Sequence, residues 1–192
     1  MDTLAAIATR RSVNRLEPPG PKEDHLTAIL EAAASAPDHE ELRPWRFIVL
    51  AGEAKAAFGD VLAEAYEARC RADGEEPTDG QVRKERNKLE RAPLVVVVAA
   101  SVVDHSRVPR VEQVSSTAAA AQNALVAATA LGYGSMWRTG DAAYDPTVKA
   151  ALGLQAGDAV VGFLYLGTTT QAPEASGPRA ELGSLVRHWQ PA

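Results

Sequence analysis

Three polar residues that could bind an anion stand together near the start of the chain, in the stretch ATRRSVNRL (8–16). A helix predicted over 3–11 leads into them, with an apolar face at positions i, i+3 and i+4: Leu4, Ile7 and Ala8. The next position on that face is Arg11, flanked by Arg10 and Ser12. Guanidinium groups pair well with phosphate or carboxylate oxygens, so we predict an anion site here. The alternative is an arginine pair that caps the helix C-terminus.

Other patterns that carry chemistry are missing from the sequence. The four histidines are scattered without the spacing of metal ligands, and Cys70 is the only cysteine, so we expect neither a protein-held metal nor an intrachain disulfide. Trp137 stands where the third glycine of a dinucleotide-binding loop would follow Gly132 and Gly134. No phosphate-binding Walker loop, nucleophile elbow or zinc-protease motif occurs.

The composition is that of an ordinary soluble protein. The 192 residues are 46% apolar and 23% charged, with a net charge of −5, and we expect one domain over 1–192. The acidic balance argues against nucleic acid as a partner. The basic stretch VRKERNKLER (82–91) contains two glutamates, and we interpret it as a solvated helix face.

The chain shows no membrane or export signal. Its N-terminus lacks a signal-peptide pattern. No charged residue occurs from Val114 to Trp137, but that stretch is rich in alanine and holds several polar residues, so it transfers poorly into lipid. A helix without charge is better explained as buried in a core or between subunits. We therefore expect a cytoplasmic protein.

Apolar periodicity predicts helices alternating with strands. The run PLVVVVAAS (93–101) has the pattern of a central strand buried on both faces. Other strands are predicted over 45–52, 133–140 and 159–167, and helices over 3–11, 22–35, 53–91 (broken by DGEEPTDG), about 111–131 and from Asp145-Pro146. This alternation indicates a layered α/β or α+β domain.

Seven stretches, in order and spacing, resemble the FMN-dependent nitroreductase family, and most closely its short YdjA-like branch. They are RRSVNRL, APDHEELRPWRFIVLAG, RAPLVVVVAA, VPRVEQ, GYGSMWRTG, VVGFLYLG and PRAELGSLVRHW. The resemblance implies an α+β fold around a mixed, mostly antiparallel sheet flanked by helices. It also implies an intertwined homodimer with FMN at the subunit interface.

The resemblance implies an activity as well. Two electrons would pass from NAD(P)H through FMN to a nitroaromatic, quinone or similar small acceptor, in ping-pong order. The same flavin site could instead serve a dedicated metabolite dehydrogenase or reductase, or an FMN carrier or sensor without useful turnover. Hydride transfer between stacked rings depends on orientation and electrostatics, so we assign no catalytic acid or base.

FMN contacts are implied for several stretches of the chain. Arg10 and Ser12 would bind the phosphate, and Arg11 would lie near the ring or the ribityl chain. His39, with Ser35 one turn before it, would reach the flavin, or else His39 is a loop residue that caps a turn. Glu41 and Arg43 replace the amide side chains common in the family, and Trp45 is expected in the core.

The second half of the chain supplies the remaining implied contacts. Trp137, Arg138 and Thr139 would touch the flavin of the partner chain, or form a strand end with Trp137 packed in the interface. Arg179 matches a basic residue that binds the FMN phosphate in the family. The end of the uncharged helix would line the nicotinamide side of NAD(P)H: Ala127, Ala128, Thr129, Ala130, Leu131 and Gly132.

Overall fold

A four-stranded antiparallel sheet forms the centre of the computed structural model, which describes residues 1–169 and 182–191. The strand order is β1-β2-β4-β3, where the strands are β1 (Trp45–Ala51), β2 (Leu94–Ala100), β3 (Gly134–Arg138) and β4 (Ala159–Gly167). Every residue of β2 is buried, which confirms the predicted central strand. Together with the helices below, this arrangement confirms the α+β class.

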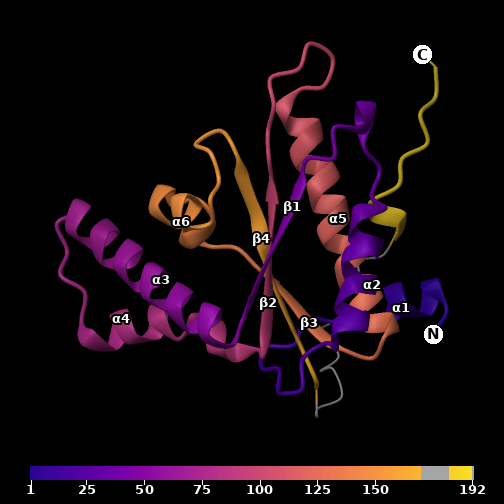
Figure 1. Ribbon diagram of the computed structural model, residues 1–192. Helices are drawn as coiled ribbons and strands as arrows, with labels where there is room; N and C mark the ends of the chain where they lie inside the picture. Colours follow the sequence, from indigo (N-terminus) through magenta and orange to yellow (C-terminus); the bar gives the residue numbers. More distant parts are fainter. Residues whose placement is uncertain (170–181, 192) are drawn as a thin grey trace.

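Helices cover both faces of the sheet (Figure 1). On one side, the α5 face, α5 (Arg110–Ala130) and α2 (Glu23–Ala34) pack against each other and the sheet, and α1 (Thr3–Thr9) lies on α5. On the other side, the α3 face, lie α3 (Gly52–Ala72), α4 (Asp79–Arg86) and α6 (Pro146–Ala151). Neighbouring residues of β2 contribute to different cores because side chains alternate along a strand: Val95 and Val97 face α3, whereas Val96 and Val98 face α5.

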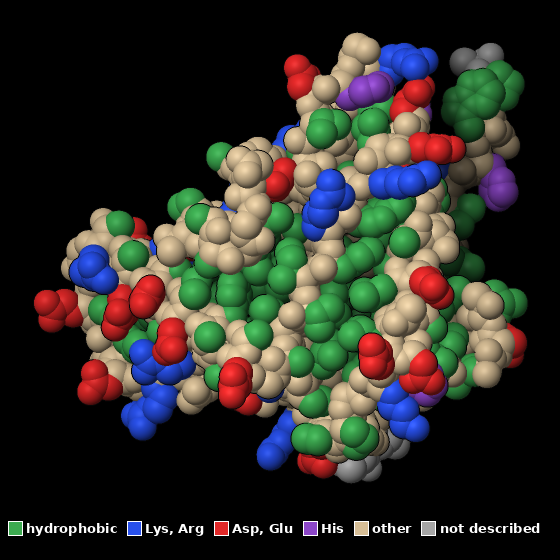
Figure 2. All heavy atoms as spheres, in the orientation of Figure 1, with side chains coloured by type: hydrophobic (Ala, Val, Ile, Leu, Met, Phe, Trp, Pro, Cys, Tyr) green, Lys and Arg blue, Asp and Glu red, His purple; other side chains and the backbone are tan. Residues whose placement is uncertain are grey.

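Within residues 1–169 and 182–191, four short 3-10 turns connect or end these elements. They are η1 (His39–Glu41), η2 (Lys88–Arg91), η3 (Asp141–Ala143) and η4 (Leu182–Ser184). Asp145 caps α6, where its side chain accepts hydrogen bonds from Thr147 N and Val148 N, as expected for Asp-Pro at a helix start. Figure 2 shows hydrophobic side chains gathered between α3 and α2, where the edge strand β1 exposes Val49.

The first helix differs from its prediction. It ends at Thr9 and not at residue 11, and Ala6 is its only buried residue, so the predicted core face is wrong. Leu4 and Ile7 are 78% and 45% exposed. The reason is tertiary: beyond Arg10 the chain leaves the helix to lie along β3, where Ser12 and Ser135 form an isolated parallel bridge.

Helix α5, which carries no charged residue after Glu112, is buried mainly by its own chain. Seven of its residues are buried: Gln113, Thr117, Ala120, Ala121, Ala124, Leu125 and Ala128. The opposite side of α5 carries Ser115, Ala118 and Gln122, of which Ser115 and Gln122 are exposed. Packing within one chain therefore explains why the buried side of α5 has no charged residue. The stripe formed by Ser115, Ala118 and Gln122 is also uncharged, and this packing does not explain it.

One glycine allows the close approach of a tryptophan. A Cβ at Gly162 would lie 2.1 Å from Trp137 Nε1, because that indole crosses β4 there and donates to Val161 O at 3.1 Å. Gly162→Ala is expected to lower the free energy of unfolding by about 1–3 kcal/mol, since the overpacked ring must move. Denaturant unfolding measures this, with Gly157→Ala as control, because a Cβ there meets nothing within 4 Å. Equal stability of the two variants would contradict the expectation.

Candidate functional site

A cavity of about 310 Å³ opens on the α3 face, where β3 ends. Three cationic side chains line it together with an apolar floor and a short loop. The cations are Lys88, Arg91 and Arg138; the remaining lining residues are Leu62, Leu89, Thr139, Gly140, Ala142, Phe163 and Tyr165. Cations over apolar and aromatic side chains suit a planar ligand with an anionic edge.

Arg138 reaches the cavity because of its register in β3. Alternation along the strand sends Met136 and Arg138 to the α3 face and Trp137 to the α5 face. The Arg138 guanidinium donates from Nη2 to Asn14 Oδ1 at 3.3 Å, which ties the end of β3 to the N-terminal segment. Gly140 follows with a φ of +89°, a conformation that glycine adopts without strain.

Lys88 and Arg91 enter the cavity from η2. Lys88 forms an ion pair with Glu85. The Arg91 guanidinium has no hydrogen bond or ion pair among the described residues, while its backbone oxygen accepts a hydrogen bond from Leu16 N at 2.9 Å. The backbone of Arg91 is thus held in place, and its side chain is available to a ligand.

Tyr165 is the titratable group at the floor of the cavity. Burial raises the pKa of Tyr165 to about 12, although the nearby Arg138 and Arg91 act in the opposite direction. The hydroxyl therefore stays protonated at neutral pH, and it lies 3.4 Å from Lys88 O, to which it donates.

The N-terminal anion motif lies beside β3. The bridge from Ser12 to Ser135, and a hydrogen bond of 3.0 Å from Val13 N to Ser135 O, bring it next to the strand that carries Arg138. Arg11 donates from Nη1 to Ala8 O at 2.9 Å and to Arg10 O at 2.8 Å, which is the helix-capping alternative. The Arg10 guanidinium forms no hydrogen bond or ion pair with the described residues.

The structure separates the three residues predicted from the WRT stretch. Arg138 and Thr139 line the cavity, whereas the Trp137 ring packs on the opposite face of the sheet. Because Ser12 and Asn14 belong to the same chain as Arg138, one chain brings these two motifs together. The contact of residues 137–139 with a partner's flavin stays a prediction.

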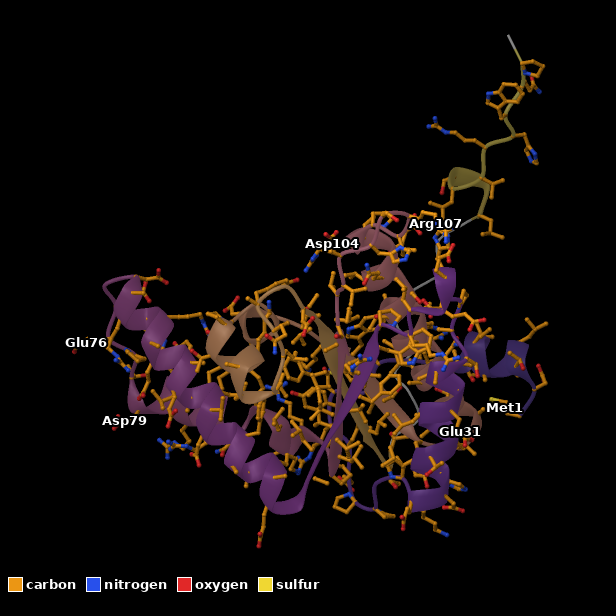
Figure 3. All side chains as sticks on the ribbon, turned by 45° about the horizontal axis from the view of Figure 1, so that its top comes forward. Met1, Glu31, Glu76, Asp79, Asp104 and Arg107 are labelled. Atoms are coloured by element: carbon orange, nitrogen blue, oxygen red, sulfur yellow. The ribbon has the colours of Figure 1, made fainter. Side chains whose placement is uncertain are left out.

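His39 and Ser35 lie on the α5 face, away from this cavity. His39 Nδ1 donates to Glu112 Oε2 at 2.7 Å in the first turn of α5, and Ser35 Oγ donates to Glu31 O. The loop after His39 is tied to Arg107, whose Nη2 lies 2.9 Å from Glu40 Oε2; Figure 3 labels Arg107 at this end of the molecule. The sheet separates His39 from the cavity, so one chain does not bring them together.

The predicted nicotinamide segment lies at the end of α5. Ala128 is buried in the core of the α5 face, Thr129 Oγ1 donates to Leu125 O at 2.9 Å, and Gly132 follows the helix with a φ of +87°. None of residues 127–132 lines the cavity. Arg179 lies outside the described residues.

Sequence reasoning missed three polar residues of this site: Asn14, Lys88 and Arg91. The stretch VRKERNKLER was interpreted as a solvated helix face, and this holds for α4. It fails for Lys88, which belongs to η2 and is partly buried in the cavity wall; Arg91 is exposed as expected, but it also belongs to η2 and lines the cavity. A signal was available in the sequence, since the run ends next to the Ala-Pro that starts the central strand.

Among residues 1–169 and 182–191, no cluster of three or more His, Cys, Asp or Glu side chains could hold a metal ion. Within the same ranges, no helix is both long enough and apolar enough to cross a membrane.

Sequence comparison identifies relatives over most of the chain. The profile of the nitroreductase family matches residues 7–168. YdjA of Escherichia coli K12, named as an NAD(P)H nitroreductase, is 40% identical over 168 residues, which are 88% of each chain. A Haemophilus influenzae protein with the same type of name is 32% identical over 176 residues, or 91% of this chain and 92% of that protein.

Solved structures show the same fold. The nitroreductase-like family protein of Bacillus cereus superposes with a TM-score of 0.83 at 24% identity, covering 100% of this chain and 97% of that one. A nitroreductase of Bacteroides fragilis, crystallised with bound FMN, superposes with a TM-score of 0.73 at 24% identity, covering 98% and 100%. At these identities the likeness establishes the fold alone.

Proposed function

The chain belongs to the nitroreductase family, and we propose that it is an FMN-dependent oxidoreductase. In this proposal it passes two electrons from NAD(P)H to a nitroaromatic, quinone or similar small acceptor in ping-pong order. The observation that carries the proposal is the cationic cavity at the end of β3, beside the Arg10-Arg11-Ser12 motif. The names of the relatives and the FMN in the Bacteroides structure support it.

The residues of the cavity fit FMN. Its volume falls at the lower end of the range for small-molecule sites, and the apolar floor of Leu62, Leu89 and Phe163 suits a flat ring system. The unpaired guanidinium of Arg91 faces the cavity, so an anionic ligand would satisfy a cation that has no partner within the described chain. The guanidinium of Arg91, which is exposed and has no partner among the described residues, supports the assignment of an anionic group to this cavity.

Each part of the site has a role in this proposal. Arg91 and Arg138 would hold the carbonyl oxygens at the pyrimidine edge of the ring, and Thr139 and Gly140 would border it. Arg10 and Ser12, next to the same strand, hold the phosphate. When bound, FMN supplies the two-electron redox chemistry, accepting hydride from the nicotinamide and delivering it to the acceptor. The two guanidinium groups stabilise the negative charge that develops at the pyrimidine edge on reduction.

We further infer that two copies of the chain complete the site. His39 lies on the opposite face of the sheet from the cavity, so it can reach a flavin only in a second copy. Apolar side chains that a second copy would cover are exposed at both ends of the chain, in α1 and in the segment that projects from the body (Figure 1): Leu4, Ile7, Leu182, Leu185, Val186 and Trp189. Exposure of this kind is typical of a protein interface.

The absorbance spectrum of the purified protein tests the proposal. We expect a flavin spectrum and the release of FMN, not FAD, on denaturation. The sequence lacks the glycine-rich dinucleotide-binding loop that would hold the adenosine half of FAD. The loaded protein should then oxidise NAD(P)H when a quinone is added. Absence of flavin binding, or release of FAD, would overturn the FMN assignment. FMN binding without turnover would indicate a carrier or sensor.

A further inference from the structure

A second cavity, of about 460 Å³, adjoins the proposed flavin cavity. Arg91 lines both cavities, so they are neighbours. The second cavity forms where residues 14–18 pass residues 87–91, and the hydrogen bond from Leu16 N to Arg91 O joins these two segments. Leu16 is buried in the core of the α3 face, so the walls of this cavity are anchored.

The donors of this cavity suit a phosphate monoester. Arg15 and Arg91 carry guanidinium groups that form no hydrogen bond or ion pair among the described residues. Asn14 accepts the Arg138 hydrogen bond through Oδ1, which leaves its amide nitrogen as a donor. Two carboxylates also line the cavity: Glu90, which is paired with Lys55 at 3.1 Å, and Glu17. Two guanidinium groups and an amide can neutralise and hydrogen-bond a phosphate dianion.

We propose that this cavity binds the 2′-phosphate of NADPH and gives the enzyme a preference for NADPH over NADH. The inference rests on the proposed function, in which the nicotinamide meets the flavin in the neighbouring cavity. NADPH differs from NADH only in this phosphate. Arg15, which the proposed function assigns to no other ligand, would discriminate between the two donors, assisted by Arg91, which lines both cavities. FMN carries the same chemical group, but the proposed function assigns its phosphate to Arg10 and Ser12.

Arg15→Gln tests the proposal because Arg15 lines only the second cavity. In the FMN-loaded protein we expect kcat/KM for NADPH to fall about tenfold, the loss of one charge-assisted contact, while kcat/KM for NADH changes by less than about twofold. Arg83→Gln is the matched control, since it removes an exposed cation of α4 that lines neither cavity. Glu17→Gln should act in the opposite direction and raise the preference for NADPH.

A binding measurement without turnover separates this proposal from the proposed function. Adenosine 2′-phosphate should bind the wild-type protein more tightly than adenosine 5′-phosphate in calorimetric titration, and Arg15→Gln should remove the difference. This result supports the cavity even where NAD(P)H oxidation fails. If Arg15→Gln weakens the binding of both nucleotides equally, or of neither, the proposal is overturned. If Arg15→Gln removes the preference for FMN over riboflavin, the cavity holds the flavin phosphate, and this result also overturns the proposal.

Discussion

Replacing Arg138 by leucine is expected to weaken FMN binding about ten- to hundredfold, since a charge-assisted hydrogen bond contributes roughly 1.5–3 kcal/mol. The guanidinium lines the proposed flavin cavity and is held by Asn14. The same variant should lower the reduction potential of bound FMN, because a cation close to the reduced ring is lost. Flavin titration measures the affinity for FMN, and redox titration against dyes of known potential measures the reduction potential of the bound FMN.

Two variants show whether the effect belongs to the site. Arg138→Lys keeps the charge and should recover much of the potential but less of the affinity, because an ammonium lacks the planar fork of donors. Arg11→Leu removes a guanidinium from the neighbouring motif that is already bonded to Ala8 O and Arg10 O, so it should weaken FMN binding less. If Arg11→Leu has the larger effect on both quantities, the ring is held by Arg11 and not by Arg138.

Local patterns in the sequence were enough to predict most of the elements. The β-branched run of β2 and the uncharged periodic stretch of α5 lie where they were expected, because each pattern reflects burial on both faces or on one. The prediction for α1 failed because a helix of seven residues has too few contacts to decide its own orientation. The segment that follows α1 pairs with β3 through Ser12 and Ser135, and this pairing decides which face of α1 is buried. The two partners lie far apart in the sequence, so local patterns do not reveal it.

The site was only partly predictable for the same reason. Arg138 was identified through its motif, whereas Arg91 was taken for a surface charge, since a run of basic residues does not reveal where a helix ends and a 3-10 turn redirects the chain. The separation of His39 from Arg138 also depends on the order of the strands and on the faces that α5 and α3 cover. That information resides in long-range contacts, which single-sequence patterns do not carry.

Gln122→Glu is expected to lower the dimer fraction and the FMN content together. Gln122 is exposed on the outer stripe of α5. It lies within residues 114–137, the longest stretch of the chain without a charged residue. If a second copy covers this stripe, a carboxylate buried there without a partner in each of the two copies should raise the dimer dissociation constant at least about tenfold. If His39 of one copy and Arg138 of the other share a flavin, binding and dimerisation are linked, so loss of one weakens the other. Sedimentation and flavin absorbance on the same preparation measure both.

The choice of position decides what this experiment can say. A charge at Ala121 would also disrupt α5, but that side chain is fully buried in the core of its own chain, so the variant would unfold the monomer. Ala68→Glu is the matched control, since it adds the same charge to an exposed position of α3. A stable Gln122→Glu monomer that keeps all its FMN would mean that one chain suffices for cofactor binding. His39 would then only hold its loop through Glu112, and the flavin would depend on the residues around Arg138 alone.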